Sequence, residues 1–171
     1  MVVPIQQYNE QIRNPQMEGV LTRTSGACYH PKPFLNKTGG AIPYGLGLVW
    51  NNTTKKIELP SVTGQEFVGI AYRADIYEEK EKDYGGGIVL KGYPVDQLVN
   101  YTAMDEVPVV IDTDFDEGND LYLRFSANGA GKEVPGRFSV SDDGGTCDLV
   151  PRARIMSSGN AGEIAIVRIW G

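Results

Sequence analysis

The sequence has few of the residues that most catalytic and metal sites require. His30 is the only histidine, and Cys28 and Cys147 are the only cysteines. A serine or cysteine nucleophile would depend on His30 as its base, and no oxyanion-hole motif lies near this histidine. A structural zinc site usually takes four such ligands, more than the chain can supply. We therefore expect that the protein is not an enzyme and holds no metal ion or cofactor.

Other features that are scarce exclude further classes of protein. Two cysteines do not form a disulfide framework, and we interpret Cys28 and Cys147 as reduced thiols. The N-terminus lacks a basic segment followed by an apolar run, and no stretch is long enough to span a membrane. The net charge is −6, and the lysines and arginines form no basic stripe. We expect no nucleic-acid partner, no membrane partner and a chain that stays in a cytoplasm.

One acidic segment invites comparison with a calcium-binding loop. Asp112, Asp114 and Asp116 match the first three oxygen ligands of an EF-hand. Gly118 then lies one position too late, and Leu123 stands where the bidentate glutamate is needed. The pattern favours an acidic turn between two strands, with an adventitious cation as the alternative.

Two glycine-rich segments carry no catalytic signal. Asp142 and Asp143 could serve as a paired acid and base, but they precede two glycines, where aspartate usually bonds its own backbone. Residues 85–87 are three glycines without the lysine and serine or threonine of a phosphate-binding loop. Both segments indicate turns.

Glycine is abundant, with 21 residues, and proline adds 10, a balance that favours short strands and turns. Apolar runs and period-two alternation predict a series of strands, and no helical segments alternate with them. The predicted strands cover 46–50, 56–59, 65–72, 88–92, 107–111, 121–126, 137–140, 149–155 and 163–170. Residues 95–104 form either a strand or a short helix.

Four local features refine this prediction. Gly69 inside the 65–72 strand, which is apolar on both faces, suggests a bulge or a close backbone approach. Pro108 cannot donate a ladder hydrogen bond, so it indicates an edge position or a strand start. Alternation places Arg124 on the polar face of its strand. The 163–170 strand is apolar on both faces apart from Arg168, so we expect the C-terminus in the core.

The predicted fold class is all-β, a jelly-roll-like sandwich or partly open barrel of about nine or ten short strands. Residues 1–16 are polar and are predicted to form an extended N-terminal arm, with a frayed terminus as the alternative. Residues 17–171 are predicted to form a single β domain, because 171 residues fit one core. The charge run within 73–87 indicates a solvated loop.

Several short motifs occur in an order that resembles the capsid decoration proteins, or structural cement proteins, of tailed bacteriophages. The resemblance extends from about residue 6 to the end of the chain. Its motifs are Tyr8-Asn9-Glu10, Gly45-Leu46-Gly47-Leu48-Val49, Phe67-Val68-Gly69-Ile70-Ala71, Val89-Leu90-Lys91-Gly92, Gly118-Asn119-Asp120-Leu121-Tyr122 and the strand from Gly162 to Val167.

The resemblance implies a structural virion protein on the outer surface of a phage head, present in the host cytoplasm during assembly. It would cement neighbouring subunits of the major capsid protein against the pressure of packaged DNA, as a homodimer or a homotrimer. The polar arm and the interface preference of tyrosine give candidate contact residues. These are Gln6, Gln7, Tyr8, Asn9, Glu10, Arg13, Tyr77 and Tyr84.

A second hypothesis is a ligand-binding or glycan-binding β-sandwich module of a phage tail or receptor-binding apparatus. An exposed Trp50 or Trp170 beside aspartates would support it.

Overall fold

The structure is a computed structural model that describes residues 33–73, 80–129 and 134–170. These residues form short strands and no helix, so none of them builds a helix suited to crossing a membrane. The strands are β1 (Phe34–Leu35), β2 (Ile42–Pro43), β3 (Gly47–Asn51), β4 (Lys56–Glu58), β5 (Glu66–Ala71), β6 (Lys80–Asp83), β7 (Val89–Tyr93), β8 (Leu98–Val99), β9 (Tyr101–Thr102), β10 (Asp105–Val110), β11 (Asp120–Arg124), β12 (Phe138–Ser139), β13 (Cys147–Ile155) and β14 (Ile164–Ile169).

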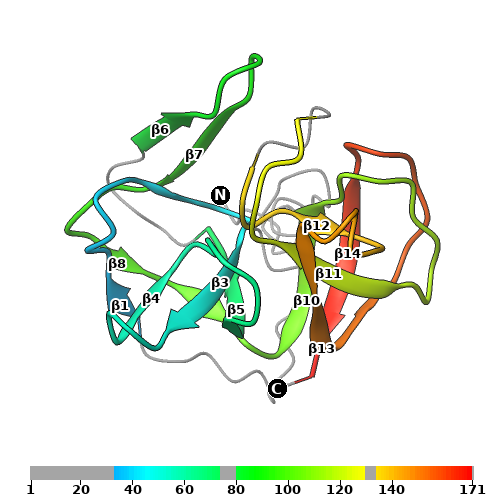
Figure 1. The fold of residues 1–171 in the computed structure, drawn as a ribbon, viewed down its shortest axis with the longest axis horizontal. Helices are drawn as coiled ribbons and strands as arrows, with labels where there is room; N and C mark the ends of the chain where they lie inside the picture. Colours follow the sequence, from blue (N-terminus) through cyan, green and yellow to red (C-terminus); the bar gives the residue numbers. More distant parts are fainter. Residues whose placement is uncertain (1–32, 74–79, 130–133, 171) are drawn as a thin grey trace, which may run out of the picture.

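The C-terminal half forms a sheet that closes on itself. Its strand order is β10-β14-β13-β11-β12, with antiparallel neighbours throughout. A parallel bridge joins Ile111, just after β10, to Phe138 of β12, and the amide of Asp112 donates to the carbonyl of Phe138 at 2.8 Å. These links connect the two ends of the strand order, so the sheet forms a barrel (Figure 1).

A second sheet, ordered β4-β3-β5-β9, packs beside the barrel and is shared by two hydrophobic cores. On β3, Val49 packs into the barrel core and Leu48 into the core on the other face. On β5, Ile70 and Ala71 divide in the same way. Alternation of side chains along a strand sends neighbours to opposite faces, so this sheet forms a middle layer between the two cores.

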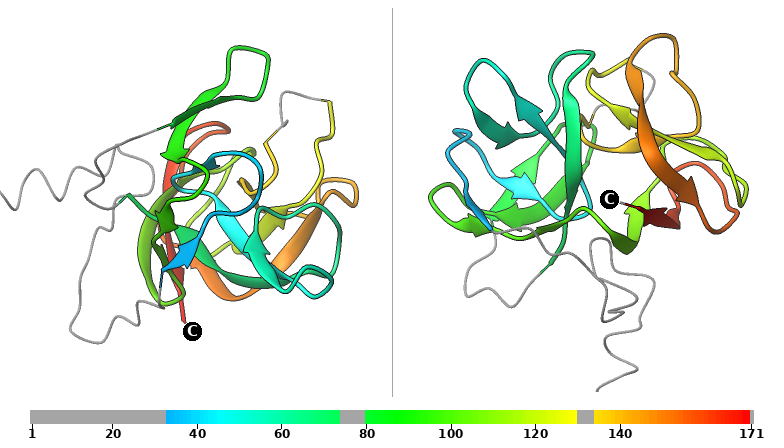
Figure 2. Two further views of the ribbon diagram at one scale, coloured as in Figure 1. Left: turned by 90° about the vertical axis from the view of Figure 1, so that its left-hand side faces the viewer. Right: turned by 90° about the horizontal axis from the view of Figure 1, so that it is seen from below.

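Two smaller sheets complete the fold. β1 pairs with β8, and β2, β7 and β6 form a three-stranded sheet in that order. The β6–β7 hairpin extends away from the two cores, as Figures 1 and 2 show. Its base is anchored by Tyr93, which is fully buried and donates its hydroxyl to the carbonyl of Tyr72 at 2.6 Å.

The structure confirms the all-β class and several of the local predictions. β3 and β4 form the hairpin predicted for 46–50 and 56–59. The pairing of β5 with β3 is shifted by a bulge beside Gly69, and a Cβ on Gly69 would lie 2.4 Å from the carbonyl oxygen of Thr102. Both features predicted for this glycine are therefore present. Pro108 lies in β10, at one end of the barrel's strand order.

Other predictions need correction. The described residues contain fourteen strands rather than nine or ten, and the jelly-roll arrangement is not confirmed. Part of the segment predicted as a charged loop, 80–83, is strand β6, because β7 supplies its ladder partner. For residues 95–104, predicted as a strand or a short helix, the strand alternative is confirmed by the two-residue strands β8 and β9. β14 lies centrally in its sheet, but only alternate side chains are buried, so its second face is partly open to solvent.

Candidate functional site

Four charged side chains form a row across the outer face of the barrel. Each lies directly opposite the next on a neighbouring strand, in the order Glu106 (β10), Arg168 (β14), Arg154 (β13) and Asp120 (β11). The Nε atom of Arg168 donates to Glu106 at 2.9 Å, and Arg154 forms an ion pair with Asp120. The two arginines at the centre are adjacent like charges, and each is balanced by the carboxylate on its other side.

Two further side chains extend this row towards the C-terminus. The backbone N–H of Trp170 donates to the carbonyl of Arg152 at 2.9 Å, so the two residues are cross-strand neighbours beyond the Arg154–Arg168 pair. Arg152 is exposed, and the indole of Trp170 is 42% exposed. We call the set Arg152, Arg154, Arg168 and Trp170 the Arg–Trp patch.

The composition of the Arg–Trp patch differs from the rest of the chain. Its three arginines adjoin two carboxylates of the described ranges, Glu106 and Asp120, on a chain with a net charge of −6. Tryptophan and arginine are the residues most enriched among those that dominate binding energy at protein interfaces. The patch therefore has the chemistry of a protein-binding surface that favours an acidic partner.

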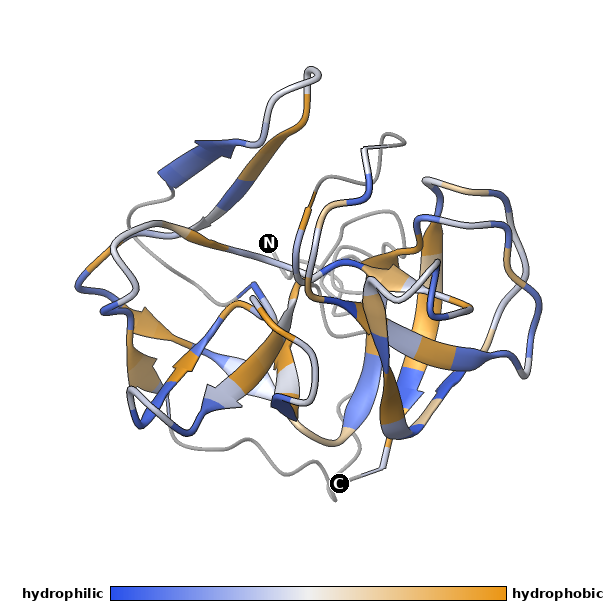
Figure 3. Ribbon diagram, viewed as in Figure 1, coloured by the Kyte–Doolittle hydropathy of each residue, from blue (hydrophilic) through white to orange (hydrophobic). Residues whose placement is uncertain are grey.

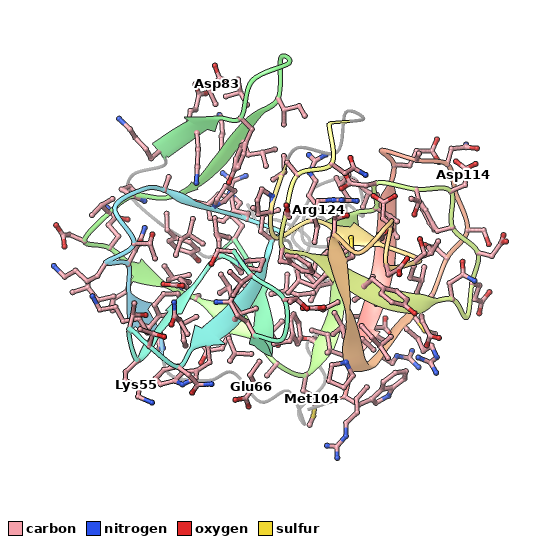
Figure 4. The ribbon with its side chains drawn as sticks, in the orientation of Figure 1. Lys55, Glu66, Asp83, Met104, Asp114 and Arg124 are labelled. Atoms are coloured by element: carbon pink, nitrogen blue, oxygen red, sulfur yellow. The ribbon has the colours of Figure 1, made fainter. Side chains whose placement is uncertain are left out.

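A buried ion-pair network lies around Arg124 of β11, beneath the 142–146 turn (Figure 4). The guanidinium donates to Asp112 at 2.8 Å, to Asp143 at 2.6 Å and to the hydroxyl of Thr146 at 2.9 Å. Arg124 is fully buried, contrary to the prediction that it faces solvent. Strand alternation alone could not show that the 142–146 turn folds over this face of β11 and covers it.

Burial and hydrogen bonding act in opposite directions on the Arg124 charge. Desolvation opposes the charged form, but the hydrogen bonds to Asp143 and Asp112 outweigh it, so the pKa of Arg124 is raised. Asp143 also accepts a hydrogen bond from the side-chain amide of Asn128 at 2.6 Å. The network is thus a permanently charged structural link between β11, the segment after β10 and the 142–146 turn.

This network takes one residue from each of two groups that the sequence offered as chemical candidates, Asp112 of the acidic segment and Asp143 of the pair Asp142 and Asp143. Asp112 is buried against Arg124, whereas Asp114 lies on an outer loop and accepts from the amide of Ala161 at 2.9 Å (Figure 4). Asp112, Asp114 and Asp116 therefore do not form the start of a calcium loop. Within 33–73, 80–129 and 134–170, no group of three His, Cys, Asp or Glu side chains is placed to hold a metal ion.

The thiol of Cys147 lies beside the same network. It is buried, and desolvation raises its pKa, an effect that the nearby Arg124 charge opposes. A buried thiol with a raised pKa is a poor nucleophile at neutral pH. Cys28 and His30 lie outside the described residues, so their predicted states remain predictions.

The projecting β6–β7 hairpin is the second exposed feature. β6 is hydrophilic along its whole length, as Figure 3 shows. The Nζ atom of Lys82 lies 4.8 Å from the centre of the Tyr84 ring, within the range of a cation–π contact. Partial burial lowers the pKa of Lys82. Gly85, Gly86 and Gly87 turn the chain at the tip, each with a positive φ that favours glycine.

Of the eight contact residues predicted from the sequence, only Tyr84 lies among the described residues. Tyr84 lies half-buried near the tip of the hairpin. The other seven, which are Gln6, Gln7, Tyr8, Asn9, Glu10, Arg13 and Tyr77, lie outside the described residues and stay predictions. Sequence reasoning missed the Arg–Trp patch, although the alternation of Arg152 and Arg154 was a signal of an exposed face.

The glycan-binding hypothesis expected an exposed tryptophan beside aspartates. Trp170 is exposed, but its cross-strand neighbour is Arg152. Trp50 is half-buried and lies opposite Ile57 of β4 and Glu66 of β5. In these strand registers no aspartate lies directly opposite either tryptophan, and the glycan-binding hypothesis stays a prediction.

The chain is similar to a family of phage proteins and to a chain of a solved capsid. A family model described as structural cement protein (E217 gp24/Pam3 gp6) matches residues 5–169. A chain from the structure titled "The capsid of Myoviridae Phage XM1" has a TM-score of 0.61, with 90% of this chain and 89% of that chain covered. The two are 14% identical, a likeness that shows a shared fold. No curated protein matches this chain.

Proposed function

Because the chain belongs to the structural cement protein family, we propose that it binds the outer surface of a phage head and holds neighbouring subunits of the major capsid protein together. The family match over residues 5–169 is the observation that carries this proposal. Membership gives the chain a structural role in the capsid and a place in the virion. The major capsid protein, the outer surface and the bridging action belong to the proposal.

A protein that bridges two subunits needs two separate contact surfaces. The Arg–Trp patch and the β6–β7 hairpin lie on different parts of the fold. The patch is on the barrel near the C-terminus, and the hairpin projects from the opposite side of the molecule (Figure 1). This separation supports bridging, because one subunit can contact the barrel while its neighbour contacts the hairpin.

The proposal is tested with heads of the source phage assembled without this protein. Purified chain is expected to bind them saturably at micromolar concentration, measured by co-sedimentation. The bound heads are expected to release their DNA at a higher temperature than bare heads, measured by dye fluorescence during heating. Heads that bind no protein at this concentration, or that gain no heat resistance when saturated, contradict the proposal.

The Arg–Trp patch is tested by Arg152→Glu, which reverses a charge at its exposed edge. Loss of an interface arginine commonly costs about 2 kcal/mol, so head binding is expected to weaken by at least about tenfold. Lys55→Glu is the matched control, since Lys55 is also exposed and has a φ of 56° against 54° for Arg152. Equal binding by the two variants contradicts a contact at the patch.

The N-terminal segment is the other proposed contact, through Gln6, Gln7, Tyr8, Asn9, Glu10 and Arg13. Deleting residues 1–14 is expected to weaken head binding several-fold while leaving the melting temperature of the free protein within a few degrees. Differential scanning fluorimetry measures the second quantity. Loss of folding would show instead that these residues belong to the core. A homodimer or homotrimer remains part of the proposal, with Tyr77 and Tyr84 as further contacts.

A further inference from the structure

Strand β6 leaves one edge of its sheet without a strand partner among the described residues. It is the last strand in the order β2-β7-β6 and pairs only with β7 through the register Lys80↔Gly92 to Asp83↔Val89. Such an edge presents backbone N–H and C=O groups to which another strand can pair. The projection of the hairpin from the rest of the fold makes this edge accessible (Figure 2).

The charges of β6 are sorted by face. Successive side chains of a strand point to opposite faces, so Lys80 and Lys82 share one face and Glu81 and Asp83 share the other. The contacts agree with this assignment, since Lys82 lies over the ring of Tyr84 two residues on, and Glu81 lies opposite Lys91 of β7. One face of the edge is therefore cationic and the other acidic.

This sorting disfavours pairing with β6 of a second copy. Two identical antiparallel strands are related by a two-fold axis perpendicular to the sheet. Residues that lie opposite each other across such a pair point their side chains to the same face of the sheet. Each residue can then oppose only itself or a residue an even number of positions away. If the axis passes at Lys82, Glu81 opposes Asp83 of the second copy; if it passes at Glu81, Lys80 opposes Lys82 of the second copy. Every such register opposes like charges, which is destabilising.

We propose that the β6 edge takes a strand of a different protein whose charges alternate in the opposite phase. Acidic side chains of that strand would face Lys80 and Lys82, and basic side chains would face Glu81 and Asp83. Backbone hydrogen bonds supply affinity in such strand addition, and the alternate side chains supply specificity. The inference rests on the proposed function for the partner, an extended segment of the major capsid protein. Any homodimer of the cement protein then uses another surface.

The exclusion of a second copy is tested by the double variant Lys82→Thr/Asp83→Lys. With a two-fold axis at position 82, Glu81 of each copy lies opposite the lysine introduced at position 83 of the other copy. The wild-type contact between the two copies of Lys82 is replaced by a contact between two threonines. Self-association is expected to strengthen by roughly tenfold over the wild type in sedimentation velocity. The control Lys56→Thr/Asp116→Lys makes the same net-charge change at exposed positions away from the edge. If the two variants associate equally, the charge pattern of β6 does not govern self-pairing and the inference fails.

The choice of partner is tested by reversing the phase of β6. The variant Lys80→Glu/Glu81→Lys/Lys82→Glu/Asp83→Lys keeps two basic and two acidic side chains in the strand, and therefore its net charge. Binding to heads that lack the protein is expected to fall by at least about tenfold. Hydrogen-exchange protection of the Tyr84 amide, which donates to the carbonyl of Ile88 at 2.9 Å, reports whether the hairpin still forms.

The outcomes separate this inference from the proposed function. A phase-reversed variant that keeps its hairpin and binds heads as tightly as the wild type overturns the inference alone. Wild-type protein that binds no heads overturns the proposed function and, with it, the partner named for β6. In that case the self-association experiment still decides whether the charge pattern blocks a second copy.

Discussion

Replacing Arg124 by methionine is expected to lower the free energy of unfolding by about 3–5 kcal/mol. The substitution keeps an unbranched side chain in the site but removes the only cation bonded to both Asp112 and Asp143 within the described residues. Asp112 is 4% exposed and Asp143 is 17% exposed, so neither carboxylate can recover full hydration. Urea denaturation monitored by circular dichroism measures the change.

Two companion variants make this result specific to the buried charge. Arg154→Met breaks the exposed ion pair with Asp120 and is expected to cost no more than about 1 kcal/mol. Combining Arg124→Met with Asp112→Asn and Asp143→Asn removes the two negative charges that lose their Arg124 partner and is expected to recover part of the lost stability. Equal losses for Arg124→Met and Arg154→Met would show that the buried network contributes no more than a surface pair.

The substitution Gly92→Ala is expected to destabilise the protein by about 3 kcal/mol or more, because its methyl group meets backbone. A Cβ at Gly92 would lie 2.1 Å from the carbonyl oxygen of Ile42 and 2.3 Å from the Cα of Pro43. Backbone atoms of a paired strand cannot rotate aside, so β2 must separate from β7. Faster hydrogen exchange at the Tyr44 amide, which donates to the carbonyl of Lys91 at 3.1 Å, would report this separation.

Gly40→Ala is the matched control for this prediction. Gly40 has no positive φ, and the nearest atom to its added Cβ is the mobile Nζ of Lys82 at 3.8 Å. Its stability is expected to change by no more than about 0.5 kcal/mol. If Gly92→Ala is equally mild, β2 and β7 are not held at the spacing that the structure gives them.

Period-two alternation and turn residues were sufficient to predict most of the strands. The β3–β4 hairpin, the bulge at Gly69 and the position of Pro108 in a terminal strand of the barrel's strand order all follow from local pattern. Gly69 and Gly92, two glycines of the motifs on which the sequence resemblance rests, are places where a Cβ would collide with a neighbouring strand. Each of these glycines allows a neighbouring strand to approach closely, but the sequence alone could not show which strand that is.

The features that were missed depend on contacts between distant segments. Lys80–Asp83 has no apolar face, and only β7 makes it a strand. Arg124 alternates like a solvent-facing residue, but the 142–146 turn covers it. Arg154 and Arg168 become neighbours only through the pairing of β13 with β14. The candidate site was therefore harder to predict than the fold, because it is defined by cross-strand register rather than by any one strand.

The middle sheet has a mechanical consequence for a protein that is pulled from two sides. Tension between the hairpin and the barrel is shared by residues 94–104, which join β7 to β10 along the chain, and by β3 and β5, which contribute side chains to both hydrophobic cores. Disrupting β3 or β5 removes side chains from both cores at once. Resistance to sustained force is set by the rate of unfolding rather than by equilibrium stability. Because the two cores share β3 and β5, we expect them to unfold together, so rupture under tension is expected as a single step.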